Sequence, residues 1–111
     1  MDIYDTANKL AKEIKESREY REYKTIKKNI DSDTTRKNKV ERFEKLRYKI
    51  QLKQINGDVS QLEDEKKKLE ETYMNLLEDD EIKQYFEKEM KFNVMIADIN
   101  KIIAEAVRDI I

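Results

Sequence analysis

The sequence predicts an all-α protein: a helical hairpin followed by a long C-terminal helix, elongated and assembled as a dimeric helical bundle. Apolar residues recur at steps of three and four along the chain, which is the period of an amphipathic helix. Glu, Lys and Leu are abundant, and all three favour helices. The 111 residues include one Gly and no Pro, so few positions force a helix to end. This length suits one domain, so we expect a single all-helical domain over residues 1–111.

Two helical segments are expected before residue 31. Asp2 is a suitable N-cap for the first. The face that this helix is expected to bury consists of Ile3, Ala7, Leu10 and Ile14. Ser17 is a candidate cap for the second, whose apolar stripe consists of Tyr20, Tyr23, Ile26 and Ile30. Neither Gly nor Pro separates the segments, so two helices and one kinked helix both remain open.

The middle of the chain predicts an antiparallel helical hairpin. Asp33 is expected to cap a helix over residues 34–56, with Val40, Phe43, Leu46 and Ile50 inward. Gly57 supplies the left-handed residue that commonly ends a helix. Ser60 and Glu63 have the spacing of a capping box for the next helix. That helix is expected to bury Leu62, Leu69, Tyr73 and Leu76.

A long helix is expected over residues 80–110, after the acidic stop at 78–80. Apolar residues follow one another at seven-residue spacing over four heptads, as in a coiled-coil seam. A helix of this length spans about 46 Å, too long for the preceding short helices to cover. We therefore expect a homodimer or higher homo-oligomer. The predicted self-association interface consists of Tyr85, Phe92, Ile96, Ile99, Ile103, Ala106 and Ile110.

Glu89 interrupts this seam. It has three interpretations: a polar residue that sets the register, a partner for Lys or Arg across an interface, or an exposed residue where the heptad drifts.

The charges balance over the whole chain, but the hairpin is polarised. Residues 36–57 carry eight basic and two acidic residues, net +6, whereas residues 58–81 carry ten acidic and three basic residues, net −7. Mutual attraction of the two arms is one interpretation. The other is a surface for RNA or for an acidic protein, with RNA not favoured. That surface would consist of Arg36, Lys37, Lys39, Arg42, Lys45, Lys49 and Lys53.

The composition argues against several classes of function. The chain has no His and no Cys, so the commonest general base and the thiolate ligands of metals and iron–sulfur clusters are missing. Its serines lie where helix caps are expected and lack a His to activate them. We therefore expect no enzyme activity, no catalytic residues, no cofactor or metal site and no small-molecule substrate. No apolar run is long enough to span a membrane and the first residues do not resemble a signal peptide, so we expect a cytoplasmic protein without membrane insertion.

The sequence resembles the YlbF/YmcA family of small helical bacterial proteins, and its closing segment looks most like the YheA-like branch. The resembling residues run in register through the chain: 3–11, Glu16-Ser17, Glu19-Tyr20, Phe43, Leu46, 51–57, 82–87 and 96–103. The resemblance implies a self-associating cytoplasmic protein of Gram-positive bacteria. Better-known relatives regulate competence, sporulation and biofilm formation, in a multiprotein complex that influences RNA processing. Some bind iron–sulfur clusters through cysteines, which this chain lacks.

Together these observations predict a non-enzymatic protein that acts by self-association and by binding regulatory proteins. The alternative is an RNA-binding accessory factor that uses the basic helix over residues 36–53.

Overall fold

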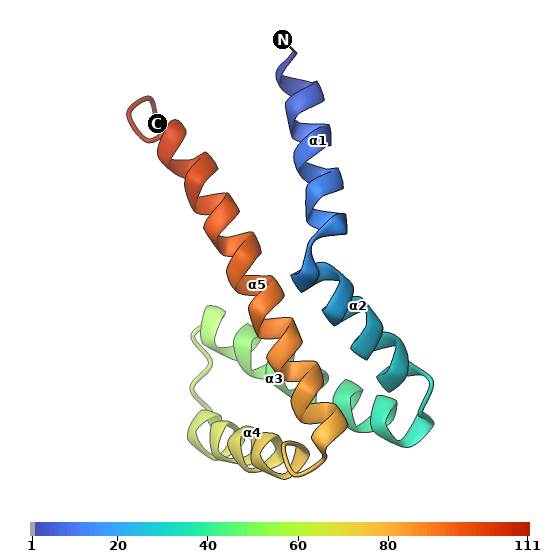
Figure 1. Cartoon of the computed structure of the whole chain (residues 1–111). Helices are drawn as coiled ribbons and strands as arrows, with labels where there is room; N and C mark the ends of the chain where they lie inside the picture. The colour runs from blue at the N-terminus through green and yellow to red at the C-terminus, as the bar shows by residue number, and fades with distance from the viewer. Residues whose placement is uncertain (1) are drawn as a thin grey trace. The chain divides into compact units, whose positions relative to one another are not determined.

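In a computed structural model, which describes residues 2–111, the chain forms five α-helices and no strand within that range (Figure 1). The helices are α1 (Ile3–Glu16), α2 (Arg18–Asp31), α3 (Thr34–Ile55), α4 (Leu62–Leu76) and α5 (Asp80–Ala106). The prediction of an all-α fold is confirmed. Contacts divide the chain into two compact units: a first unit formed by residues up to Lys27 together with Tyr85–Ile111, and a second unit formed by Lys28–Gln84.

The start of the chain forms two helices rather than one kinked helix. Asp2 caps α1, because its Oδ1 accepts a hydrogen bond of 3.0 Å from the Tyr4 backbone N–H. Ser17 is extended, with ψ of 153°, and this interrupts the helical hydrogen-bond ladder. Its Oγ accepts a hydrogen bond of 3.2 Å from the Tyr20 N–H and so satisfies a free donor at the start of α2. Both expected caps are confirmed.

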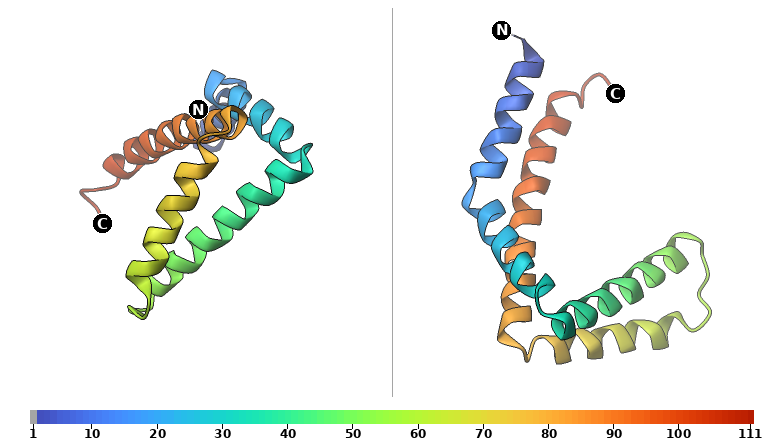
Figure 2. Two further views of the ribbon diagram at one scale, coloured as in Figure 1. Left: turned by 90° about the horizontal axis from the view of Figure 1, so that it is seen from below. Right: turned by 90° about the vertical axis from the view of Figure 1, so that its right-hand side faces the viewer.

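The second unit is built around the α3–α4 hairpin, whose two helices run side by side (Figure 2). Asp33 caps α3 as predicted, since its Oδ1 accepts a hydrogen bond of 3.2 Å from the Arg36 N–H. The rings of Phe43 on α3 and Tyr73 on α4 lie 5.6 Å apart. The buried apolar residues of this unit are Ile30, Val40, Phe43, Ile50, Leu76 and Ile82.

The turn of this hairpin agrees with the sequence only in part. Gly57 has a φ of +72°, the left-handed conformation expected of it. The predicted capping box of Ser60 and Glu63 is wrong, because α4 begins one residue later, after Gln61, which has a φ of 59° and makes no side-chain cap. The Ser60 N–H instead donates to Asp58 Oδ1 over 3.0 Å. Asp58 thus forms a local turn that displaces the start of the helix.

The first unit is held together by aromatic contacts between α2 and α5. The Tyr23 ring lies 5.6 Å from Phe92 and 5.9 Å from Tyr85, and the Tyr20 ring lies 6.1 Å from Phe92. Centroid separations of this size are typical of favourable tilted aromatic pairs. The buried apolar residues of this unit are Ile26, Tyr85 and Phe86.

Two expectations about the first unit are wrong. Ile3 and Ala7 are exposed, Leu10 and Ile14 are only half-buried, and α1 has no buried residue. The period located its apolar face correctly, but nothing among residues 2–111 packs over the N-terminal half of α1. The last helix ends at Ala106 rather than near residue 110. Beyond it the chain tightens into turns, with the Ile110 N–H donating to the Val107 carbonyl over 3.2 Å.

None of the described helices is both long and apolar enough to cross a membrane.

Candidate functional site

The predicted α5 interface divides into two parts. Tyr85 is buried and Phe92 half-buried, both against the tyrosines of α2. Ile96 and Ile99 are half-buried. The remainder, Ala106 with Ile103 and Ile110, is exposed, and the exposed fractions of the two isoleucines are 53% and 82%. The first half of the predicted interface therefore packs against other residues of the same chain, and the second half is exposed to solvent.

Glu89 lies in the covered half of this stripe. It is half-buried, and its Oε2 accepts a hydrogen bond of 3.4 Å from the Tyr23 hydroxyl. The interpretation as an exposed residue is wrong. Within the chain the partner of Glu89 is the Tyr23 hydroxyl on α2, and this long polar contact joins α2 to α5 inside the aromatic cluster.

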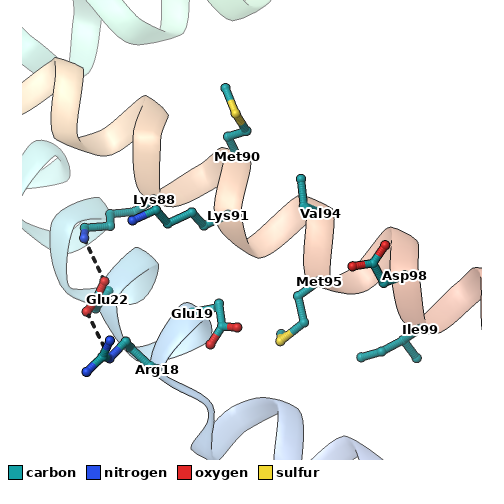
Figure 3. A pocket seen from close by; sticks show the side chains of 10 residues that line it. All are labelled: Arg18, Glu19, Glu22, Lys88, Met90, Lys91, Val94, Met95, Asp98 and Ile99. Carbon is teal, nitrogen blue, oxygen red and sulfur yellow. Dashed lines mark ion pairs between the residues drawn. The ribbon is translucent and has the colours of Figure 1, made fainter.

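A groove of about 700 Å³ lies between α2 and α5 in the first unit (Figure 3). Charged residues line it at the α2 side and apolar residues of α5 line its other part, where Met90 and Val94 are exposed. The lining residues are Arg18, Glu19, Glu22, Lys88, Met90, Lys91, Val94, Met95, Asp98 and Ile99. Sequence reasoning singled out only Ile99 among them as a site residue, because the others lie off the heptad stripe or are charged.

An ion pair closes one end of this groove. Glu22 Oε2 lies 2.7 Å from Lys88 Nζ, and Glu22 Oε1 lies 3.8 Å from Arg18 Nε (Figure 3). The hydrogen bond from Lys88, opposed by partial desolvation, lowers the pKa of Glu22 below its usual value. The pair links α2 to α5.

The apolar face of α1 belongs to the same unit as the exposed half of α5. Ile3 is 76% exposed and Tyr4 74% exposed, although both lie on a helix of clear amphipathic pattern. An amphipathic helix normally buries its apolar stripe. The first unit thus has two uncovered apolar stripes, one near each end of the chain.

The basic arm is only partly neutralised by the acidic arm. Arg36 Nε lies 2.9 Å from Asp79 Oδ2, and Lys53 pairs with Glu65 of α4. The hydrogen bond with Asp79 raises the pKa of Arg36, and the same bond lowers the pKa of Asp79. The other members of the predicted basic surface are exposed and form no ion pair within residues 2–111: Lys37, Lys39, Arg42, Lys45 and Lys49.

Sequence reasoning missed an apolar stripe on the outer side of α3. Tyr48, Leu52 and Ile55 are all exposed, and they follow one another at steps of four and three. This spacing is typical of an apolar face of a helix and could be recognised in the sequence. It competed with the stripe of Val40, Phe43 and Ile50, which forms the core and was the better continuous match to a helical period.

The described residues hold no group of three or more acidic side chains placed to bind a metal ion.

Comparison with known proteins identifies relatives over nearly the whole chain. The family described as "Control of competence regulator ComK, YlbF/YmcA" matches residues 3–108. A UPF0342 protein from Halothermothrix orenii is 39% identical over 93% of this chain and 86% of the relative. Another from Alkalihalophilus pseudofirmus is 33% identical over 98% of this chain and 92% of the relative. A third, from Caldicellulosiruptor saccharolyticus, is 34% identical over 96% and 88%. No solved structure matches the chain.

Proposed function

The chain belongs to the YlbF/YmcA family of bacterial proteins, and we propose that it acts as a non-enzymatic regulator in the cytoplasm through self-association and the binding of other proteins. The single observation that carries this proposal is the exposed apolar half of α5. Isolated apolar residues are normal on a surface, whereas contiguous apolar stripes mark interaction sites. The stripe that continues the packed seam from Ile99 through Ile103 to Ala106, where α5 ends, is of the second kind.

A second copy of the chain is the occupant that we propose for this stripe. The same unit offers another uncovered apolar stripe on α1, around Ile3. In a twofold dimer one pair of complementary surfaces is used twice. The α1 stripe of each protomer would then cover the α5 stripe of its partner, and both exposed stripes would be buried by one arrangement.

Burial of these side chains supplies a useful part of a dimer's stability. Complete burial of one Ile side chain stabilises by about 1.5–3 kcal/mol. Ile103 is 53% exposed, so its remaining surface is worth about 1–1.5 kcal/mol. Twofold symmetry uses each contact twice, so Ile103 alone would contribute about 2–3 kcal/mol to the dimer.

The experiment is a sedimentation-velocity series on the whole chain and two variants at tens of micromolar. Ile103→Asp places an unpaired carboxylate in the proposed interface, which is strongly unfavourable. The matched control is Ala104→Asp, the same charge change at an exposed position about 100° around the helix. Ile103 suits this test better than Ile99, because Ile99 lines the groove within the chain and its replacement would also disturb the protomer.

We expect the wild type and Ala104→Asp to sediment as dimers or larger, and Ile103→Asp to sediment as a monomer with unchanged helix content. A monomeric wild type at these concentrations would contradict the proposal, and so would a dimer that survives Ile103→Asp.

The regulatory part of the proposal rests on the family, whose description names control of a competence regulator. It is tested by deleting the gene in its own host and measuring the expression of competence genes. We expect the wild-type gene and Ala104→Asp, but not Ile103→Asp, to restore the original level. Unchanged expression in the deletion strain would count against this role.

A further inference from the structure

The outer face of α3 carries an apolar stripe that no part of the second unit covers. Tyr48, Leu52 and Ile55 are 62%, 40% and 79% exposed. Positions four and three apart share one face of a helix, so these side chains form a continuous row about two turns long. Val59, in the turn that follows, is exposed as well and lengthens the apolar surface toward the tip of the hairpin.

A row of positive charge runs beside this stripe. Arg42, Lys45 and Lys49 are exposed and form no ion pair within residues 2–111. At 100° per residue, Lys45 and Lys49 lie within about 60° of Leu52 on the helix surface. The face therefore combines an apolar row with an adjacent basic row, and both lie away from the buried row of Val40, Phe43 and Ile50.

We propose that this face of α3 binds an acidic amphipathic helix of a partner protein. Such a helix would set its apolar side chains, spaced at i, i+4 and i+7, against Tyr48, Leu52 and Ile55. Its flanking Asp or Glu side chains would then meet Lys45 and Lys49. Helices recognised through a row of apolar anchors with complementary charge beside it are a recurrent mode of protein binding.

The exposed residues favour this partner over a nucleic acid. Surfaces that bind single strands stack bases on successive aromatic rings. Here Tyr48 is the one aromatic residue of the row, and Leu52 and Ile55 offer neither stacking nor hydrogen bonds to bases. A basic row alone would suit a phosphate backbone, but the aliphatic side chains beside it would stay uncovered.

The same surface fits an anionic membrane or the α4 helix of a second copy less well. The neighbouring helix α4 exposes Glu63, Asp64, Glu70 and Glu71, which anionic lipids would repel. The α4 helix of a second copy is acidic as well, but the only large apolar residue on its exposed surface is Met74. It cannot supply the three anchors that the row on α3 requires. This surface belongs to the second unit, whereas the stripes of α1 and of the exposed half of α5 belong to the first.

The test begins with a phage-displayed library of helical peptides selected against the whole chain, with counter-selection against the Leu52→Glu/Ile55→Glu variant. The preferred peptide is then synthesised, labelled and titrated by fluorescence anisotropy. Binding is measured to the wild type, to Lys45→Glu/Lys49→Glu and to the matched control Lys66→Glu/Lys67→Glu, which makes the same charge change at exposed positions of α4. A second peptide replaces the acidic residues of the first by Lys.

We expect the selected peptides to share acidic residues beside an apolar i, i+4, i+7 row. Lys45→Glu/Lys49→Glu should weaken binding of the acidic peptide at least tenfold and should gain affinity for the Lys-substituted peptide. The control should bind the acidic peptide like the wild type. Circular dichroism should show the same helix content in all variants, and sedimentation should show the same oligomeric state.

Several results would overturn the inference. One is a selection without enrichment, or an enrichment of basic peptides. Another is a peptide whose affinity is indifferent to the charge reversal. A third is preferential binding of oligouridylate or of phosphatidylglycerol vesicles that is lost in Lys45→Glu/Lys49→Glu. A change of oligomeric state in that variant would instead assign the face to contacts between copies, and would likewise overturn the inference.

Discussion

Replacing Phe43 by Ala is expected to destabilise the α3–α4 hairpin more than replacement of any exposed residue. Phe43 is 4% exposed, and its ring lies 5.6 Å from the Tyr73 ring and 5.5 Å from the guanidinium carbon of Arg47. The side chain is therefore enclosed on α3, packed against α4 and covered in part by a cation. Its truncation leaves a cavity that helices joined by a short turn cannot easily close.

The expected loss follows from that enclosure. Truncation of a buried Phe to Ala costs about 3–5 kcal/mol, which includes the lost burial and the cavity. The aromatic pair with Tyr73 accounts for about 0.5–1.5 kcal/mol of it. Chains of this size are stable by about 5–15 kcal/mol, so the variant would lose a large share of its free energy of unfolding.

The assay is urea unfolding followed by far-ultraviolet circular dichroism, at one protein concentration for all variants. Phe43→Ala is compared with Tyr48→Ala, an exposed aromatic residue on the same helix, for which we expect a change within about 0.5 kcal/mol. A double-mutant cycle of Phe43→Leu and Tyr73→Leu isolates the pair and should give a coupling of about 0.5–1.5 kcal/mol.

The reasoning would be refuted by a Phe43→Ala variant that loses less than about 1 kcal/mol, or no more than Tyr48→Ala loses. A coupling of zero in the cycle would show that the two rings do not stabilise each other. In that case Phe43 would act only through its burial on α3.

Three further predictions use the same unfolding assay. Tyr23→Phe removes the donor to Glu89 and should cost about 0.5–1.5 kcal/mol; no change would mean that water replaces the phenol. Gly57→Ala should cost about 1–2 kcal/mol, because residue 57 has a φ of +72°, although the added Cβ would contact no other atom. Gly57→Asn should cost less, because Asn tolerates the left-handed conformation better; equal losses in the two variants would contradict a conformational cause. Asp79 has a pKa lowered chiefly by Arg36, so its contribution is present above pH about 4 and is lost as the pH falls through the folded-state pKa. The stability difference between the wild type and Asp79→Asn should therefore shrink between pH 7 and pH 3, and a constant difference would exclude the ionised pair as its source.

The helix boundaries show how far local chemistry reaches. Asp2, Ser17 and Asp33 were identifiable as caps, and each accepts a backbone hydrogen bond from two or three residues away. Gly57 was identifiable as a left-handed stop. The capping box predicted for Ser60 and Glu63 does not form, because two local hydrogen bonds compete for the Ser60 N–H. In the structure this N–H donates to the Asp58 side chain. A helix cap can be predicted from sequence where only one short-range side-chain hydrogen bond is available. Where two such bonds compete, the sequence does not show which one forms.

The functional surfaces were harder to predict, for a different reason. The heptad spacing located the apolar stripe of α5 but gave no information on what covers it. The charge count located the basic arm. The spacing of Tyr48, Leu52 and Ile55 beside it indicates an apolar row, but only the structure shows that nothing within residues 2–111 covers this row.

By itself, the sequence determined the helical class, most helix ends and the family, because these depend on periodicity and on bonds between residues close in the chain. The tertiary structure decided which apolar stripes are used internally and which remain exposed. Tyr85 and Phe92 pack on the tyrosines of α2, whereas Ile103 continues the same stripe into solvent and Ile110 is exposed beyond the end of the helix. The hydrophobic effect is non-directional and favours any apolar partner. Only the path of the chain, which brings α2 beside one half of α5, determines which part of the stripe stays exposed.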